Sequence, residues 1–76
     1  MDVRIGVTYS PKEIVVEFGD DSNRADVKSA AEAALAGEQT VLWLTDKRGR
    51  EVGVPADKVA YIEIGGEAES RIGFGG

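Results

Sequence analysis

The stretch from Val54 to Gly65 places the tightest constraint on how this chain can fold. It reads Val-Pro-Ala-Asp-Lys-Val-Ala-Tyr-Ile-Glu-Ile-Gly. An apolar run that stops at a proline, a short polar turn and a second apolar run that stops at a glycine are typical of two strands joined by a turn. The C-terminal half is therefore predicted to be built from strands.

Alternation of apolar and polar residues predicts two more strands at the N-terminus. Residues 2–9 and 12–18 both alternate, and Ser10-Pro11 separates them. Proline fixes one backbone angle and has no N–H to donate to a neighbouring strand, so Ser10-Pro11 favours a turn. The apolar face of the first strand contains Val3, Ile5, Val7 and Tyr9, and that of the second contains Ile14, Val16 and Phe18. The two strands are predicted to form a hairpin.

One segment has the period of a helix. Val27, Ala30, Ala31, Ala34 and Leu35 recur at the spacing of a single helix face over about three turns. Ser22 or Asn23 is the expected N-cap, and Gly37 suits the left-handed position just past the C-terminus.

Residues 39–45 form the third predicted strand. Its apolar residues do not alternate, which indicates a central strand covered on both faces. The loop from Asp46 to Arg50 is predicted to be a hairpin turn, with Gly49 as its left-handed residue. This turn places Trp43 opposite Gly53, and Leu42 and Leu44 beside Val54 and Val52.

The last predicted strand spans residues 58–64, with Val59 and Tyr61 on one face and Ala60, Ile62 and Ile64 on the other. Ile72 and Phe74 in the glycine-rich end favour a short edge strand or a frayed tail. The fold class is therefore α+β: a single twisted, antiparallel-rich sheet in the order β-β-α-β-β-β, with one helix packed on it. We assign residues 1–65 to a single domain and residues 66–76 to a C-terminal tail.

Composition excludes several kinds of function. The 76 residues contain no cysteine and no histidine, which rules out disulfides and zinc sites built from thiolates and imidazoles. No serine has a histidine or a Ser-x-x-Lys arrangement to activate it, so we expect no enzyme, no catalytic residue, no cofactor and no metal. The sequence has no signal peptide and no membrane span, which favours a cytoplasmic protein.

Five segments resemble a known family. They are Val3–Val7, Pro11–Val15, Leu42–Asp46, Val54–Gly65 and the ending Arg71-Ile72-Gly73-Phe74-Gly75. Together they resemble a family of short, uncharacterised actinobacterial proteins, classed as a domain of unknown function. The resemblance implies a small α+β cytoplasmic protein and supplies no activity or functional residue.

An exposed apolar face is the favoured functional feature. If the helix covers Leu42 and Leu44, then Val41, Trp43, Val59 and Tyr61 share the opposite face of the sheet. Tryptophan and tyrosine are enriched at the centres of protein interfaces. The hypothesis is a non-enzymatic interaction module that self-associates, as a homodimer, or docks a protein partner through this face or an open strand edge. The alternative is that loops, the tail or a curled sheet bury the face internally.

Two further hypotheses remain open. Lys47, Arg48 and Arg50, together with Arg71, form a candidate contact for nucleic acid, although the net charge of −5 opposes weak binding to phosphates. Binding of a small molecule or nucleotide between the helix and the sheet is the third, and no motif supports it.

Overall fold

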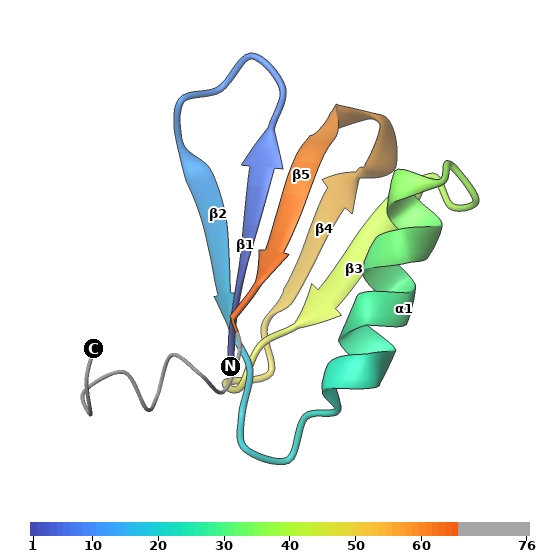
Figure 1. Ribbon diagram of the computed structural model, residues 1–76. Coiled ribbons are helices and arrows are strands. Elements are labelled where there is room, and N and C mark those ends of the chain that lie inside the picture. Colours follow the sequence, from blue (N-terminus) through green and yellow to red (C-terminus); the bar gives the residue numbers. More distant parts are fainter. Residues whose placement is uncertain (66–76) are drawn as a thin grey trace, which may run out of the picture.

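The computed structural model describes residues 1–65. Along the chain it contains β1 (Asp2–Val7), β2 (Glu13–Glu17), α1 (Arg24–Leu35), β3 (Val41–Thr45), β4 (Glu51–Pro55), the short 3-10 helix η1 (Ala56–Lys58) and β5 (Val59–Ile64). The α+β class and the predicted order of elements are confirmed (Figure 1). The predicted tail strand with Ile72 and Phe74 lies outside the described residues.

The strands form two sheets, not one. One sheet has three strands in the order β2-β1-β5, and β3 and β4 form a separate two-stranded sheet. The predicted single sheet is therefore wrong. After β4 the chain turns through η1, and β5 pairs with β1 near the start of the chain instead of extending the β3–β4 hairpin. Both predicted hairpins are confirmed, since each depends only on a local turn.

A bulge in β5 changes which side chains face inward. Gly6 of β1 pairs with Tyr61, but the next residue, Val7, pairs with Val59, so Ala60 is an extra residue in β5. Side chains alternate along a strand, and one extra residue reverses that alternation. Val59 consequently packs against the core, and it does not share a face with Tyr61 as the alternation predicted.

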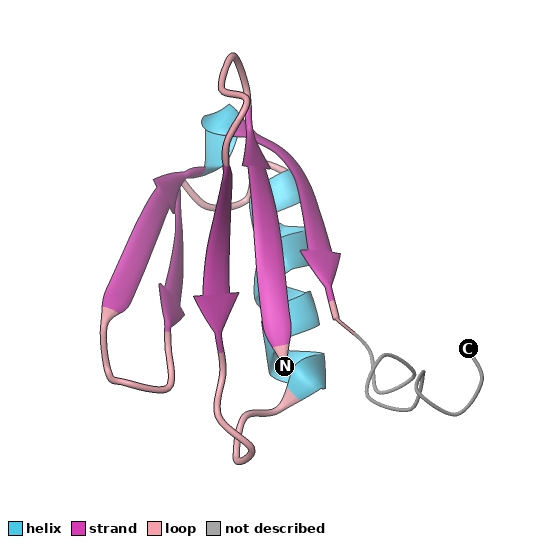
Figure 2. Cartoon of the chain, turned by 90° about the vertical axis from the view of Figure 1, so that its left-hand side faces the viewer, coloured by secondary structure: helices cyan, strands magenta, loops and turns pink. Residues whose placement is uncertain are grey.

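One core lies between the two sheets and α1. The helix packs against β3, β5 and η1. It lies beside β3 in Figure 1 and behind the strands in Figure 2. The buried apolar side chains are Val3 and Ile5 of β1, Val16 of β2, Val27, Ala31 and Ala34 of α1, Leu42 and Leu44 of β3, Val54 of β4, and Ala56 of η1. Alanine at two of the three buried helix positions lets the helix backbone approach the strands closely.

The helix ends follow the predicted chemistry. The Asn23 side chain accepts hydrogen bonds from the N–H groups of Ala25 and Asp26, at 2.8 and 3.3 Å. It thereby satisfies two of the donors that the first turn leaves unpaired. Gly37 has a φ of +78° just past the last turn, as predicted. Leu35 was predicted to lie on the core face of the helix. It is 53% exposed because it is the last residue of that apolar face.

Burial alternates along β3, which corrects a second prediction. Leu42 and Leu44 are buried, whereas Trp43 and Thr45 are exposed and Val41 is half-buried. Within residues 1–65 the strand is covered on one face only, because no described element lies over the outer side of the two-stranded sheet. Tyr9 also differs from the sequence expectation: β1 ends at Val7, and Tyr9 is fully exposed in the following turn with a φ of +62°.

Candidate functional site

Trp43 lies on the outer face of the β3–β4 hairpin, opposite Gly53. The predicted pairing of these two residues is confirmed. A Cβ atom at position 53 would be 2.6 Å from Cζ3 of the indole, so the ring occupies the space that a larger residue would need. The side chain is nevertheless 62% exposed. Glycine at position 53 thus holds a large aromatic ring against the hairpin while leaving most of it in water.

The hairpin tolerates a proline because of its register. Ala56 donates its N–H to the carbonyl oxygen of Thr40 at 2.9 Å, so the neighbouring pair of Val41 and Pro55 is one that exchanges no ladder hydrogen bonds. Pro55 therefore loses no bond within the fold. On the outer face, the pair of Val41 and Pro55 lies next to the Trp43–Gly53 pair, which makes this end of the hairpin surface apolar.

A groove of about 310 Å³ adjoins Trp43, between β3 and the first half of α1. We call it the Trp43 groove. It is lined by Phe18, Ser22, Asn23, Asp26, Val27, Ala30, Trp43, Leu44 and Thr45. Asp26 is the one charged residue in this lining. The groove therefore combines an apolar surface with a single carboxylate.

A second aromatic residue lies over a second glycine, on the outer face of the three-stranded sheet. Tyr61 is opposite Gly6, and a Cβ atom at position 6 would overlap the phenol ring. The Tyr61 hydroxyl donates a hydrogen bond to Oε2 of Glu13. That hydrogen bond, with burial and the negative charge of Glu13 adding to it, raises the pKa of Tyr61 above its usual value. The ring is 47% exposed and fixed at both ends.

The four residues predicted to form one interface lie in different places. Val41 and Trp43 are in β3, Tyr61 is on the other sheet, and Val59 is turned toward the core. The outer face that carries Tyr61 is mainly charged, and Arg4 and Glu63 form an exposed ion pair there at 3.8 Å. Of the predicted set, the structure thus brings together Val41 and Trp43 alone.

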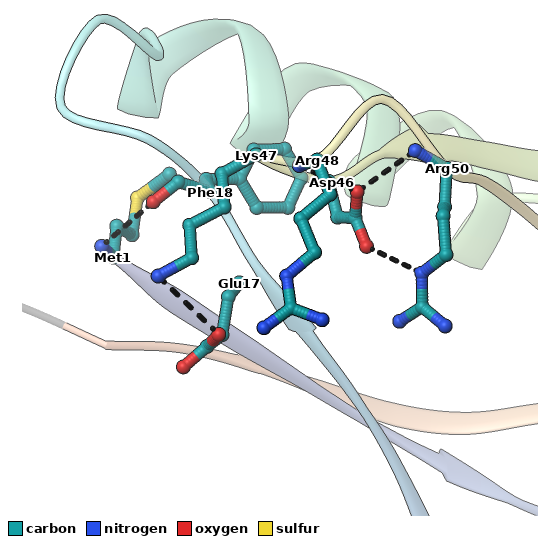
Figure 3. A network of polar contacts seen from close by, with 7 residues as sticks. All are labelled: Met1, Glu17, Phe18, Asp46, Lys47, Arg48 and Arg50. Atoms are coloured by element: carbon teal, nitrogen blue, oxygen red, sulfur yellow. Dashed lines mark hydrogen bonds and ion pairs between the residues drawn. The ribbon is translucent and has the colours of Figure 1, made fainter.

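The predicted basic loop is held by carboxylates. Asp46 of this loop is buried and accepts hydrogen bonds from the N–H groups of Arg48 and Arg50, at 2.9 and 2.8 Å (Figure 3). Nε of Arg50 adds a third at 2.9 Å, and this side-chain hydrogen bond is the main reason that the pKa of Asp46 is below its usual value. Lys47 pairs with Glu17 at 3.6 Å and also donates its backbone N–H to the Glu17 carbonyl.

The candidate nucleic-acid contact is therefore largely neutralised. Two of its three described cations, Lys47 and Arg50, face carboxylates, and Arg48 is the third. Arg71, the fourth predicted contact, lies outside the described residues. Asp46 holds the turn of this loop, and the sequence reasoning missed that role. An aspartate at the first position of a tight turn is the signal that would have found it.

A second cleft, of about 510 Å³, lies at the other end of the helix. Among its lining residues are Leu35, Gly37, Thr40, Asp57 and Val59. This is where the third hypothesis, a ligand between helix and strands, would place a small molecule. Asp57 is the one ionisable residue in the lining.

Other kinds of site receive no support from residues 1–65. In that range no group of three or more acidic side chains is arranged to hold a metal ion. The helices of the described part are too short and too polar to cross a membrane.

Comparison with known proteins gives a family and no activity. None of the curated proteins matches the sequence. A family model described as protein of unknown function (DUF3107) matches residues 1–75. The match covers every element described above. The chain therefore belongs to this family of proteins of unknown function, DUF3107.

Proposed function

We propose that this protein is a cytoplasmic, non-enzymatic protein-interaction module whose contact surface is the outer face of the β3–β4 hairpin, centred on Trp43. The observation that carries the proposal is that the Trp43 side chain is exposed and yet held in place. It is 62% exposed, and Gly53 beneath it leaves room for the ring to lie flat on the hairpin.

An exposed but fixed tryptophan suits binding for two reasons. A partner that covers the ring removes a large apolar area from water, at about 25 cal/mol per Å². The ring also loses little conformational freedom when it binds, because the hairpin already orients it. Both effects explain why tryptophan is enriched at the centres of interfaces. Val41 and Pro55 extend the apolar surface on one side of the ring, and Thr45 and Glu51 form the polar pair on the other side.

The other hypotheses have weaker support. Binding to nucleic acid would use a loop in which Lys47 and Arg50 already face carboxylates, on a chain with a net charge of −5. Catalysis near neutral pH would have to proceed without histidine or cysteine. Among residues 1–65, the two side chains with shifted pKa values, Asp46 and Tyr61, form hydrogen bonds that hold a turn and a sheet face.

Site-specific photocross-linking tests the proposal. A photoreactive phenylalanine analogue is placed at position 43 in cells of the source organism, and the same analogue at position 9 is the control. Tyr9 is also aromatic and fully exposed, but it lies in the turn between β1 and β2. We expect position 43 to give one discrete adduct that is absent at position 9. The adduct's mass separates a partner protein from a second copy of the chain.

The proposal would be refuted if position 43 gave no adduct, or the same adducts as position 9. Trp43→Ser is the companion variant. Because the ring is mostly exposed, the variant is expected to keep its circular dichroism spectrum and to compete poorly with the natural chain for the partner. A Trp43→Ser chain that is unfolded would show that Trp43 serves the fold, and the proposal would be wrong.

A further inference from the structure

We propose that the partner binds as an extended segment, apolar at its centre, that adds a strand to the open edge of β4 beside the Trp43 ring. This inference rests on the proposed function and names how the partner is held. It follows from the hydrogen-bond pattern of the β3–β4 hairpin, the position of the ring and the size of the edge.

The outer edge of β4 carries unpaired backbone groups. The hydrogen bond from Ala56 to Thr40 fixes which residue pairs of the hairpin exchange bonds, and every second pair does not. Glu51, Gly53 and Pro55 belong to the pairs without bonds, so their backbone groups point away from β3. Because proline has no N–H, the edge offers two N–H groups and three carbonyl groups. Within residues 1–65 these groups make no hydrogen bond, and β4 pairs with β3 alone.

This edge is open to an incoming strand. All three of its residues are exposed. In Figure 2, β4 is the strand at the far left, and no described element lies beyond it. A strand edge of this kind is a template for a further strand, and proteins usually protect such an edge with charges or cover it. Here the centre of the edge is Gly53, which is uncharged and uncovered by any described element.

The other strand edges are less available. The helix α1 packs against both β3 and β5. By the same alternation, β2 has an outward edge formed by Glu13, Val15 and Glu17. There the Glu17 carbonyl already accepts the backbone N–H of Lys47 at 2.8 Å, and a carboxylate lies on either side of Val15. An added strand is therefore expected at β4.

The Trp43 ring lies where it would contact such a strand. The atoms nearest to a Cβ at position 53 belong to the six-membered ring of the indole, so this end of the side chain lies over β4. A residue paired with Gly53 has its side chain on the same outer face. Gly53 has no side chain to separate that residue from the ring. The neighbours of this residue would face inward beside Val52 and Val54, which are half-buried and buried, so all three central residues are expected to be apolar.

The size of the edge favours a linear segment over a second folded copy. A strand of five residues is about 17 Å long. Stable pairs of folded proteins bury about 1,600 Å² in total, far more than one such edge and one ring supply. A short segment needs less area, because its main-chain hydrogen bonds provide the affinity. Two copies of this chain, each with a net charge of −5, also repel each other.

A nuclear magnetic resonance titration with a short peptide tests the inference. The probe is acetyl-Thr-Val-Ile-Val-Thr-amide, and the matched control has the same side chains with N-methyl groups on its three central residues. The readout is the backbone amide signals of Glu51 and Gly53. We expect these signals to shift with a dissociation constant of about 1 mM. The N-methylated peptide should bind at least about ten-fold more weakly, as for the loss of two hydrogen bonds.

Two variants of equal net charge locate the added strand. Glu51→Pro removes an N–H from the β4 edge, and Glu13→Pro removes the corresponding N–H from the β2 edge. Neither N–H is bonded within the fold, and Pro55 already occupies an equivalent position. With the Gly53 signal as readout, we expect Glu51→Pro to weaken the peptide about five-fold and Glu13→Pro to leave its binding within about 1.5-fold. If Glu51→Pro fails to fold, the two peptides remain the test.

Several results would overturn the inference. Equal binding of the two peptides would show that main-chain pairing is not used, and equal weakening by the two variants would show that the peptide binds elsewhere. A Gly53 signal that moves with protein concentration alone would mean that a second copy pairs with the edge. A Gly53 amide that already exchanges slowly in the dilute chain would mean that the chain covers its own edge. If the peptide fails while position 43 still cross-links to one partner, the added strand is wrong and the proposed function stands. If both experiments fail, both proposals fall.

Discussion

Replacing Gly53 by alanine tests how the hairpin holds Trp43. The new Cβ would lie 2.6 Å from Cζ3 and 2.8 Å from Cη2 of the indole, too close for the present position of the ring. The ring must therefore lift from the hairpin. With 62% of its surface already exposed, about two fifths of it is covered in the folded protein.

The expected cost follows from that covered surface. A tryptophan side chain has up to about 250 Å² to bury, so two fifths is about 100 Å², or about 2.5 kcal/mol at 25 cal/mol per Å². This is an upper limit, because a lifted ring still touches its neighbours. Alanine in a strand is favoured over glycine by about 0.5–1 kcal/mol, which offsets part of the loss. We expect Gly53→Ala to lower the free energy of unfolding by about 1–2 kcal/mol.

A double-mutant cycle isolates the contact between the two residues. In a Trp43→Ser background no ring lies above position 53, so Gly53→Ala is expected to be neutral or to stabilise by about 0.5–1 kcal/mol. Urea denaturation followed by circular dichroism measures all four proteins, including those without tryptophan. In the Trp43-containing pair, the fluorescence of Gly53→Ala should also shift to longer wavelength as the ring becomes more exposed.

Gly37→Ala is the control for the cycle. Gly37 has a φ of +78°, and a Cβ atom at this position would meet nothing within 4 Å beyond its chain neighbours and its own helix. Alanine there therefore costs backbone strain and removes no contact with Trp43. It should destabilise both backgrounds equally, by about 1 kcal/mol. If Gly53→Ala behaved as Gly37→Ala does, with the same cost whether or not Trp43 is present, the explanation of Gly53 as the support of the ring would be wrong.

Four further predictions concern the core, the helix cap and the dependence of stability on pH. Leu42→Ala should destabilise by about 2–5 kcal/mol because Leu42 is 1% exposed, and Leu35→Ala, at 53% exposure, should have little effect in the same urea denaturation. Asn23→Ala should cost about 0.5–2 kcal/mol and reduce the helical signal, since it frees two N–H groups. The lowered pKa of Asp46 predicts stability that is present above pH 3.8 and lost as the pH falls below that value, and Asp46→Asn should flatten this part of a thermal denaturation series. The raised pKa of Tyr61 predicts stability that is present below pH 10 and lost above it, with Tyr61→Phe less sensitive there.

Local rules explain which features the sequence could predict. The pairing of Trp43 with Gly53 depends on the length of one turn, and the N-cap at Asn23 depends on a side chain two residues from its donor. Gly49 has a φ of +86° in that turn, as its position predicted. Each of these is decided within about ten residues, so the local sequence contains the necessary information.

Long-range pairing explains what the sequence could not predict. Whether β5 joins β4 or β1 depends on contacts between residues more than fifty positions apart, such as Ile62 with Ile5. The extra residue Ala60 is not marked by a glycine or proline, so regular alternation placed Val59 on the wrong face. The prediction of a single sheet joined Tyr61 to Trp43 in one surface, although two separate sheets carry the two aromatic rings.

The two aromatic rings over glycines differ in a way that leads us to propose Trp43, and not Tyr61, as the binding centre. Tyr61 lies over Gly6 of a three-stranded sheet, and its hydroxyl donates to Glu13, so its one polar group is already bonded. Within residues 1–65 the indole N–H of Trp43 makes no hydrogen bond. A buried tryptophan usually finds a partner for this group, and an interface supplies one when it covers the ring. The Tyr61 hydroxyl is thus bonded within its own sheet, whereas Trp43 offers an apolar ring and an exposed N–H that makes no hydrogen bond to residues 1–65.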